Sequence, residues 1–389
     1  MKLAFVAPFF GAHAAGGAEA ECRATALHLA ERGHEIDILT TCLLDLQHDW
    51  NVDAFAAGVS ADGPLTVRRF RSDPVDTQRF ARLNLAVQSG RATPEEARAF
   101  TADHINSQDL YRWLADNHVR YDRVVFIPYL FGTTLYGSRL CPEKTILIPC
   151  LHDEGYARLP AVRDLFHRAA RIVFHVEAEA RLAETLYGPL PGKSWIVGEG
   201  VDTVLQGDAA RFRKTFGIGG PFLLCCGRKD ASKNTPELLR YFADSPAVRR
   251  HGLHLVLLGP GSVSLPPQAQ GLIHDLGFVS HQDKFDAYAA CSLFVQPSRN
   301  ESFSLVLMEA WDFARPVLVH ADCEVLRDHV LQAQGGLAYA HAAGFSATVD
   351  WLLSHPDAAA ACGQSGQHYV RSRYAWPEVM HRWETEVLA

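Results

Sequence analysis

The chain has 389 residues, of which 48% are hydrophobic and 21% are charged, and its formal net charge is −7. This size and composition indicate a soluble globular protein of two ordinary domains, and the negative balance argues against a nucleic-acid binder. No apolar run is long enough to span a bilayer. Nine cysteines without paired spacing, with Cys225 and Cys226 adjacent, indicate reduced thiols in a cytosolic protein rather than a disulfide framework.

The opening segment predicts a strand at residues 2–10, a glycine turn, a helix that ends at Gly33, and a second strand at 35–41. A secretory signal is excluded because Pro8 interrupts the apolar run and two glutamates follow it. Such a βαβ unit builds a parallel sheet, so the first half is expected to be an open α/β domain. Further strands are predicted at 123–130, 144–151, 171–176 and 193–198.

Two basic stretches of the first half have alternative interpretations. The segment "VRRFR" at 67–71 lies in an irregular region and is interpreted as the solvated face of a strand. Contact with an acidic acceptor or with lipid headgroups is the alternative. The apolar and basic segment at 161–173 fits either a buried helix or a membrane-surface contact.

The alternation of strands and helices starts again near residue 204, with strands predicted at 222–228, 253–261, 272–278 and 293–298. We therefore predict domains at 1–203 and 204–371. The last residues, from 374 on, form an amphipathic helix with Trp376, Val379 and Trp383 on one side. Ligands of such sheets bind beyond the carboxyl ends of the strands, and we expect the chemistry there.

Two cations follow one of these strand ends. Gly227 ends the strand, and Arg228 and Lys233 lie in the loop after it. Arginine offers a rigid fork to phosphate oxygens and lysine a mobile point charge. Two loop cations that are merely solvated are the plainer interpretation of this segment alone.

The stretch "RNESFSLVLMEAWDFARP" at 299–316 strengthens the phosphate interpretation. A polar turn follows a strand there, and a helix is predicted to start near Ser304, where unpaired N–H groups and the helix dipole attract an anion. Glu301 at this place would repel a phosphate, so it suits neutral hydroxyls. Glu309, further along the helix, suits the two hydroxyls of a ribose. Structural ion pairs are the alternative for both glutamates.

With these motifs the chain resembles the retaining glycosyltransferases of the two-domain GT-B fold, in particular family GT4. The hallmarks are the two glutamates separated by seven residues and the Gly-Arg pair with a lysine five residues after the arginine. The resemblance covers almost the whole chain, with a glycine-rich loop near the N-terminus and a segment at 276–298. The chain departs from the family at Glu199, where asparagine is usual, at Phe313 and Ala314, where Cys-Gly is common, and in "ESFS", where "EGFG" is usual.

The resemblance implies a donor site in the second domain. Arg228 and Lys233 are implied to hold the donor diphosphate without a metal, Glu301 the hydroxyls of the transferred sugar, and Glu309 the ribose. The segment Ser302, Phe303 and Ser304 is implied to contact phosphates or sugar, and the backbone of Gly277 and Val279 to contact the base. The reaction is expected on one face of the sugar, with the leaving phosphate accepting the proton. Glu301 as a covalent nucleophile is disfavoured.

The resemblance also implies an acceptor site in the first domain, formed by Gly16 and Gly17 of the glycine-rich loop and by Asp153, with His152 near the reacting sugar. Two Rossmann-like domains are expected to face each other across a cleft, and a helix at about 372–389 to pack back on the first domain. His152, Asp153 and Glu154 also suggest a metal site, but neighbours on one loop rarely all reach one ion. Neither a metal nor another cofactor is expected.

The implied activity is transfer of a hexose from a UDP- or GDP-sugar to an acceptor hydroxyl, in bacterial polysaccharide, glycolipid or other glycoconjugate biosynthesis. The implied partners are the donor and a sugar or lipid-linked acceptor, with no nucleic acid. A cytoplasmic protein is expected, and peripheral contact with the inner face of the membrane is left open. The alternatives are a GT-B epimerase or phosphorylase and a catalytically silent nucleotide-sugar binding subunit. A dehydrogenase is disfavoured because the glycine turn does not fit the dinucleotide fingerprint.

Overall fold

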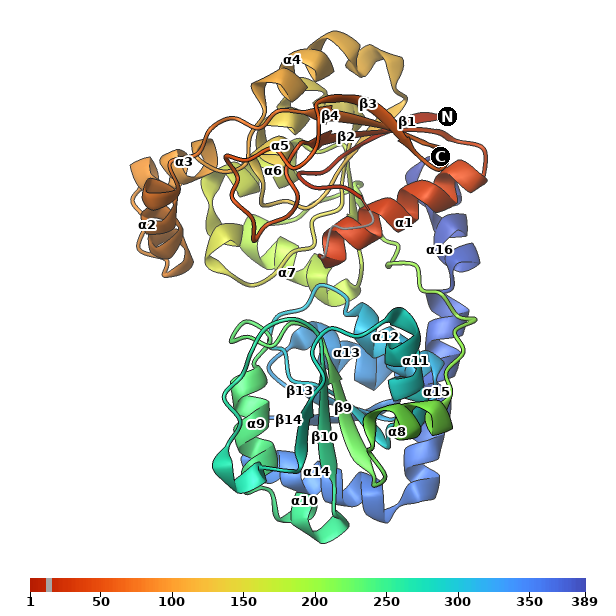
Figure 1. The fold of residues 1–389 in the computed structure, drawn as a ribbon. Coiled ribbons are helices and arrows are strands. Elements are labelled where there is room, and N and C mark those ends of the chain that lie inside the picture. Colours follow the sequence, from red (N-terminus) through yellow and green to blue (C-terminus); the bar gives the residue numbers. More distant parts are fainter. Residues whose placement is uncertain (12–15) are drawn as a thin grey trace. The chain divides into compact units, whose positions relative to one another are not determined.

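The computed structural model describes residues 1–11 and 16–389, and these divide into two compact units (Figure 1). Unit 1 is Met1–Gly200 together with Val379–Ala389, and unit 2 is Val201–Glu378. Each unit is built on its own sheet, and each is described by itself.

Unit 1 contains an eight-stranded sheet in the order β3-β4-β2-β1-β5-β6-β7-β8. All neighbours pair in parallel except β3 and β4, which form an antiparallel edge. The central strand β1 is buried on both faces, as parallel strands covered by helices usually are. The strands are Lys2–Val6 (β1), Glu35–Thr41 (β2), Gly58–Asp62 (β3), Leu65–Phe70 (β4), Arg123–Phe126 (β5), Thr145–Leu147 (β6), Arg171–Phe174 (β7) and Ser194–Ile196 (β8).

Helices α2 to α7 share one hydrophobic core with residues of β1 such as Ala4 and Val6. The sequence gives several of these helices clear starts. Thr93 and Glu96 form a capping box before α3, and Asp76 and Ser107 cap α2 and α4. The helices are Gly17–Glu31 (α1), Thr77–Gln88 (α2), Pro94–Ala102 (α3), Gln108–Asn117 (α4), Gly132–Gly137 (α5), Pro160–Arg168 (α6) and Glu177–Tyr187 (α7).

Unit 2 contains a six-stranded parallel sheet in the order β11-β10-β9-β12-β13-β14. The chain runs outward from β9 through β10 to β11 and then returns to the other side of β9 with β12. The topological switch point of this sheet therefore lies between β9 and β12. The strands are Phe222–Cys226 (β9), His254–Leu258 (β10), Ile273–Asp275 (β11), Leu293–Gln296 (β12), Val317–His320 (β13) and Gly336–Tyr339 (β14).

Helices cover both faces of this sheet (Figure 1). Helices α9, α10 and α14 bury their apolar side chains in the core on one face. On the other face Phe212 of α8 stacks on Phe222, and Tyr288 of α11 packs on Phe294. The helices are Ala209–Phe216 (α8), Thr235–Asp244 (α9), Pro246–His251 (α10), His281–Ala290 (α11), Leu305–Asp312 (α12), Glu324–Ala333 (α13), Ala342–Ser354 (α14) and Pro356–Arg373 (α15).

The C-terminal segment passes from unit 2 into unit 1. It runs through α16 (Trp376–Arg382) and a π-helical turn, Trp383–Val387. Val379, Trp383 and Val387 are buried there, and Arg382 donates a hydrogen bond of 2.9 Å from Nε to the carbonyl of Val197. The apolar side of this amphipathic segment is thus buried.

The fold agrees with the two parallel-sheet domains that the sequence predicts, and each of the strands predicted in chain order is present. The basic stretch on β4 is only partly a solvated face. Arg68 lies over the ring of Trp113, and the half-buried Arg69 donates to the carbonyls of Phe10 and Thr41. The apolar side chains of α6 are buried, which favours the buried-helix interpretation of 161–173.

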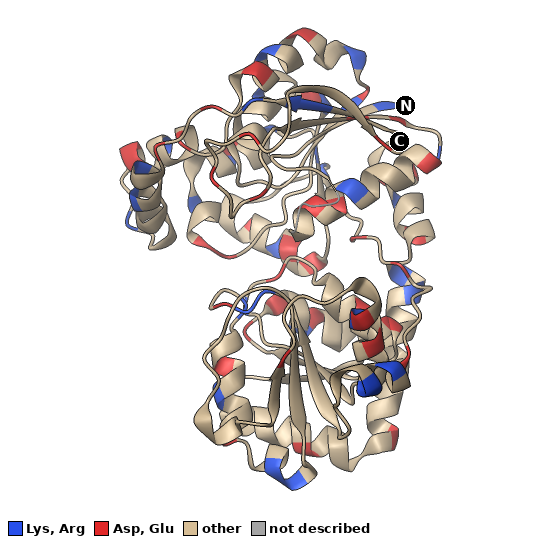
Figure 2. Ribbon diagram, viewed as in Figure 1, with Lys and Arg blue, Asp and Glu red and all other residues tan. Residues whose placement is uncertain are grey.

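Charged residues of both signs are interspersed over both units (Figure 2). Within the described part of the chain, every helix is too short or too polar to cross a membrane. The nine cysteines are all free thiols.

Candidate functional site

The two sequence motifs of the second half lie at the switch point of the sheet of unit 2. Gly227 and Arg228 follow β9, and residues 297–304 follow β12, which pairs with β9 in parallel. At a switch point the connections that leave two adjacent strands run in opposite directions, and the crevice between them is the usual ligand site of an open α/β sheet. The topology therefore brings together motifs that are about seventy residues apart in the chain.

Lys233 and Glu301 form an ion pair at this place. The Nζ atom of Lys233 lies 2.7 Å from Oε1 of Glu301, whose side chain is only 10% exposed. Gln296 at the end of β12 donates from Nε2 to the same oxygen at 3.1 Å and to Oγ of Ser304 at 3.1 Å. The carboxylate of Glu301 is thus fixed in position, with its second oxygen not engaged by these two donors.

Arg228 is more exposed than Lys233. Its guanidinium lies 3.6 Å from the carboxylate of Asp230 and donates to Oγ of Ser232 at 3.4 Å. Asp230 in turn accepts from the backbone N–H of Lys233 at 3.0 Å. Burial by itself raises the pKa of Asp230, but hydrogen bonds from Ser232 and Lys233 outweigh it and hold the pKa below its usual range. Asp230 thus contacts the guanidinium of Arg228 and fixes the backbone of Lys233 in the same loop.

Glu309 lies on α12 and has two partners in α11. Its Oε1 lies 2.6 Å from Nζ of Lys284, and its Oε2 accepts from the hydroxyl of Tyr288 at 2.9 Å. Burial, with the nearby Cys226 and Glu309 adding to it, raises the pKa of Tyr288 well above its ordinary value, so this hydroxyl stays a donor. The two glutamates of the motif therefore each hold a lysine, as the structural alternative predicted, and both remain within a few residues of the start of α12.

The start of α12 is at Leu305, as the sequence predicts, and Ser304 is its N-cap. Ser304 has φ +80° and ψ 75°, a left-handed conformation that favours glycine. Phe303 is buried and packs edge-on against Tyr374, while Ser302 is half-buried. The first N–H groups of this eight-residue helix lie just beyond the Glu301 carboxylate in the sequence.

Glycines line the neighbouring strand ends. Gly227, Gly259 and Gly277 all have positive φ, and a side chain on Gly259 would meet the carbonyl oxygen of Gly227 at 2.1 Å. The N–H of Gly259 also donates to the carbonyl of Gly277 at 2.7 Å. Three adjacent strands can therefore end in closely packed turns. Val279 lies two residues beyond and is half-buried.

The residues predicted for the first domain are placed in unit 1 as follows. Gly16 is the N-cap of α1 and Gly17 its first residue, while residues 12–15 of the glycine-rich loop lie outside the described part of the chain. His152 follows β6 and is half-buried. Asp153 pairs with Arg158 at 2.6 Å, and Glu154 accepts from the hydroxyl of Tyr129 at 2.8 Å.

These partners draw the side chains of Asp153 and Glu154 away from a common point. Of the residues that the structure describes, the group able to hold a metal ion is a different one, Glu21, Cys150 and His175.

Comparison with known proteins finds a family match in the second unit. Residues 208–369 match the model of the glycosyl transferases group 1. This part of the chain is therefore similar to the group 1 glycosyl transferases. The resemblance that the glutamate pair and the Gly-Arg motif indicate is confirmed.

Two curated relatives carry the same name, D-inositol 3-phosphate glycosyltransferase. The protein of Geodermatophilus obscurus is 32% identical over 188 residues, which are 43% of this chain and 42% of that protein. The protein of Gordonia bronchialis is 26% identical over 394 residues, 93% of this chain and 81% of that protein. The chain thus matches less than half the length of the first relative and most of the second.

Solved structures show that the whole chain has the GT-B fold. The sucrose-phosphate synthase of Thermosynechococcus elongatus superposes with a TM-score of 0.71 at 16% identity, covering 99% of this chain and 98% of that one. The Anabaena protein HepE, in complex with UDP and glucose, superposes with a TM-score of 0.72 at 15% identity, covering 100% and 99%.

Sequence reasoning missed the partners that position the group 1 motif residues. Lys284 and Tyr288 lie four residues apart on one face of α11, which is a signal for a shared contact. Gln296 is a polar residue at the end of an otherwise apolar strand, where it meets the strand-end site. Gly259 follows the apolar run of β10, and its role depends on contact with a glycine from another strand.

Proposed function

We propose that the chain is a retaining glycosyltransferase that moves a hexose from a nucleoside-diphosphate sugar to an acceptor hydroxyl. The observation that carries the proposal is the Lys233–Glu301 pair at the switch point, with Arg228 beside it. It brings a phosphate-binding charge and a hydroxyl-binding carboxylate to adjacent strand ends, next to the start of a helix. The group 1 family match and the UDP complex of HepE support the same donor class.

In this mechanism the cations stabilise the leaving group. The glycosidic bond breaks as negative charge collects on the diphosphate, and Arg228 and Lys233 are already in place to offset it. Fixed charges in a site of low dielectric act without reorganisation, and losing one such contact costs about 3 kcal/mol, or roughly a hundredfold in rate. We propose that no divalent metal is needed for this step, because the two cations supply the charge that a metal would bring.

Glu301 is proposed to accept hydrogen bonds from hydroxyls of the transferred sugar, through the oxygen that Lys233 and Gln296 leave available. Glu309 is proposed to accept from the ribose, with Lys284 and Tyr288 holding it. The acceptor attacks from the face that the diphosphate leaves, and a phosphate oxygen takes its proton. The anomeric configuration is therefore retained.

The first test is a thermal-shift titration with UDP, GDP, ADP and CDP in the presence of EDTA. A nucleotide at about a hundred times its dissociation constant stabilises the fold by about 2.7 kcal/mol. We expect one of the four to stabilise the wild type and the response to be lost in Arg228→Ala. The matched control is Arg250→Ala, an exposed arginine of α10, a helix that precedes β10 and so lies away from the strand ends.

An equal response in Arg228→Ala would show that the phosphate site is wrongly placed. Incubation of the wild type with the donor sugar then separates an enzyme from a silent binding subunit, because only an enzyme hydrolyses the donor slowly without acceptor. Proton NMR of the transferred anomeric centre tests retention.

The acceptor is proposed to bind in unit 1, where His152 and Asp153 follow β6. The names of the curated relatives make D-inositol 3-phosphate one acceptor to assay, beside lipid-linked sugars of bacterial glycoconjugate synthesis. We expect His152→Ala to lower transfer at least tenfold while nucleotide binding stays unchanged. Loss of nucleotide binding in this variant would contradict the assignment.

A further inference from the structure

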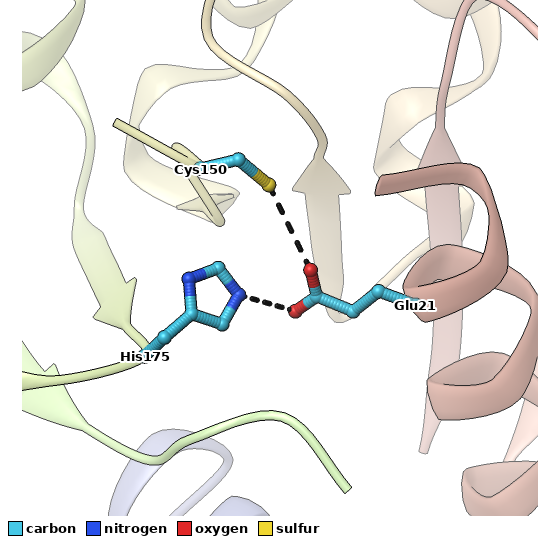
Figure 3. A group of neighbouring side chains, drawn as sticks. All are labelled: Glu21, Cys150 and His175. Carbon is cyan, nitrogen blue, oxygen red and sulfur yellow. Dashed lines mark hydrogen bonds and ion pairs between the residues drawn. The ribbon is translucent and has the colours of Figure 1, made fainter. Parts of the chain in front are cut away.

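A second polar cluster lies in unit 1 and involves none of the donor residues. Glu21 comes from α1, Cys150 from the loop after β6, and His175 from the loop after β7. Figure 3 shows the three side chains pointing toward one another from these three elements. Glu21 and His175 are almost fully buried, at 5% and 1% exposure.

The spacing of the three groups suits one small ion. Nε2 of His175 lies 2.8 Å from Oε1 of Glu21, and Sγ of Cys150 lies 3.7 Å from Oε2 of the same carboxylate. All the ligand atoms lie within 4.8 Å of one another. A tetrahedral zinc ion, with bonds of about 2.0 Å to nitrogen or oxygen and about 2.3 Å to sulfur, needs ligand atoms roughly 3.3 to 3.7 Å apart. Small side-chain rotations close the remaining difference.

Glu179 holds two of the three ligands in place. Its Oε2 lies 3.1 Å from Nδ1 of His175 and accepts from the backbone N–H of the same residue at 2.7 Å. Its Oε1 accepts from the backbone N–H of Leu151, the neighbour of Cys150, at 2.6 Å. A carboxylate on the far nitrogen of an imidazole is the usual outer partner of a histidine that binds zinc. Here it leaves Nε2 directed at Glu21 and Cys150.

The charges around the thiol also favour a cation. The thiol of Cys150 lies against the carboxylate of Glu21, and Glu179 lies on the far side of the His175 imidazole. The carboxylates of Glu21 and Glu179 both contact the single imidazole of His175. A divalent ion bound here would face the carboxylate of Glu21, and its binding would expel the thiol proton of Cys150 to solvent so that the ion balances the thiolate.

We propose that Glu21, Cys150 and His175 bind one Zn²⁺ ion, with Glu179 as the outer partner of the histidine and the fourth position open to water. Nitrogen, oxygen and sulfur ligands together suit zinc, and three protein ligands with one open position form a common zinc arrangement. The ion would tie the first helix of unit 1 to the ends of β6 and β7. The proposal concerns a different unit from the donor phosphates and does not depend on the proposed activity.

Zinc content tests the proposal directly. Full-length protein is stripped with a chelator, incubated with Zn²⁺, desalted and analysed by mass spectrometry for metal content. We expect one zinc per chain in the wild type and in Cys141→Ala, whose thiol is buried elsewhere in unit 1. We expect Cys150→Ala and Glu21→Gln to bind at least a hundredfold more weakly. Glu179→Gln should lose roughly ten- to a hundredfold, as an outer partner does.

Cobalt gives a second readout, which can be measured in the wild type without relying on any variant. Co²⁺ bound to a thiolate shows a near-ultraviolet charge-transfer band, which we expect in the wild type and in Cys141→Ala and not in Cys150→Ala. Circular dichroism verifies that each variant is folded. If Cys150→Ala does not fold, protection of Cys150 from alkylation by Zn²⁺ in the wild type, measured by peptide mass mapping, replaces it.

Absence of zinc and of the cobalt band in the wild type would overturn the proposal and leave a metal-free ion cluster. Equal metal binding in Cys150→Ala and Glu21→Gln would overturn the ligand assignment. Nucleotide-induced thermal shifts should be unchanged in Cys150→Ala, so failure of the zinc site and failure of the donor site are distinguishable.

Discussion

Ser304 occupies a backbone conformation that a side chain disfavours, at the point where the helix of the glutamate motif begins. Its Oγ compensates in part by accepting from Gln296 at 3.1 Å. Serine in place of glycine at this position therefore strains the backbone but adds a hydrogen bond from Gln296, which also donates to Glu301. The sequence shows that serines replace the usual glycines in "ESFS", but only the structure shows that Ser304 is the strained one.

This strain is measurable by comparing two substitutions at one position. Ser304→Ala and Ser304→Gly both remove the hydroxyl, but only glycine relieves the left-handed backbone, which costs about 1–2 kcal/mol for other residues. We expect Ser304→Gly to be more stable than Ser304→Ala by about that amount in urea unfolding. At Ser302, which does not have positive φ, the order should be reversed. Equal stability of Ser304→Gly and Ser304→Ala would contradict backbone strain at this position.

Glu301 offers a test that separates sugar binding from nucleotide binding. If its carboxylate accepts sugar hydroxyls, Glu301→Gln should lower kcat by roughly a hundredfold while the affinity for the free nucleotide changes little. Steady-state kinetics and a nucleotide titration measure the two quantities. A large loss of nucleotide affinity would instead indicate that the pair with Lys233 serves the phosphates only.

At the level of single residues, sequence reasoning found the motif side chains and missed their partners. Arg228 and Lys233 follow one predicted strand end, and Glu301 and Glu309 flank a predicted helix start, but it is the spacing shared with family GT4 that singles out the four residues together. The zinc-type cluster could not be found in the same way. Its members come from residues 21, 150 and 175, and the sequence contains no local spacing that relates them.

At the scale of elements, a buried carboxylate joins α8 to α11. Asp286 is buried and accepts from Nη2 of Arg211 at 2.5 Å and from the backbone N–H of Asp208 at 2.8 Å. Burial raises the pKa of Asp286, but the hydrogen bonds from Arg211, Asp208 and Gln282 outweigh it, so the pKa is lowered in the folded state. The ionised form is therefore favoured by folding.

The lowered pKa predicts the direction of a pH effect. The stabilisation is fully present above the unfolded-state pKa, near 3.8, and is lost as the pH falls through the lower folded-state pKa. Asp286→Asn should destabilise unit 2 by about 1–3 kcal/mol at neutral pH and by less in acid, measured by urea unfolding at several pH values. The exposed Asp244→Asn should show little change at either pH. A constant difference for Asp286→Asn across this range would contradict the lowered pKa.

Secondary structure was predictable where apolar runs are short and bounded by glycine or proline. The strands flanking both motifs follow that rule, and Pro297 marks the end of the run that contains β12. Strands β13 and β14 were not among the predicted strands, although "VLVH" of β13 is also a short apolar run after a proline. The antiparallel edge strand β3 was also missed, since its residues are exposed and carry little apolar pattern.

At the scale of the whole molecule, unit 1 is completed by residues from the far end of the chain. Trp383 is 2% exposed, so Trp383→Ala should cost about 3–5 kcal/mol by leaving a cavity. Trp351, at 42% exposure on α14 of unit 2, is the matched control and should cost far less. Hydrogen exchange should show faster opening of unit 1 alone in the Trp383 variant. Equal effects of the two substitutions would contradict the packing of the C-terminal segment.

This arrangement has a consequence for how the protein is made. Unit 2 is continuous, whereas unit 1 is interrupted by it and receives Val379–Ala389 only after all of unit 2 has been synthesised. The N-terminal domain usually matures first during synthesis, but here we expect unit 2 to be complete before unit 1. During translation the early part of unit 1 must wait, with a surface meant for Trp383 and Val387 exposed, until the chain returns. We expect the nascent chain to be most prone to aggregation in that interval, because apolar surface is exposed.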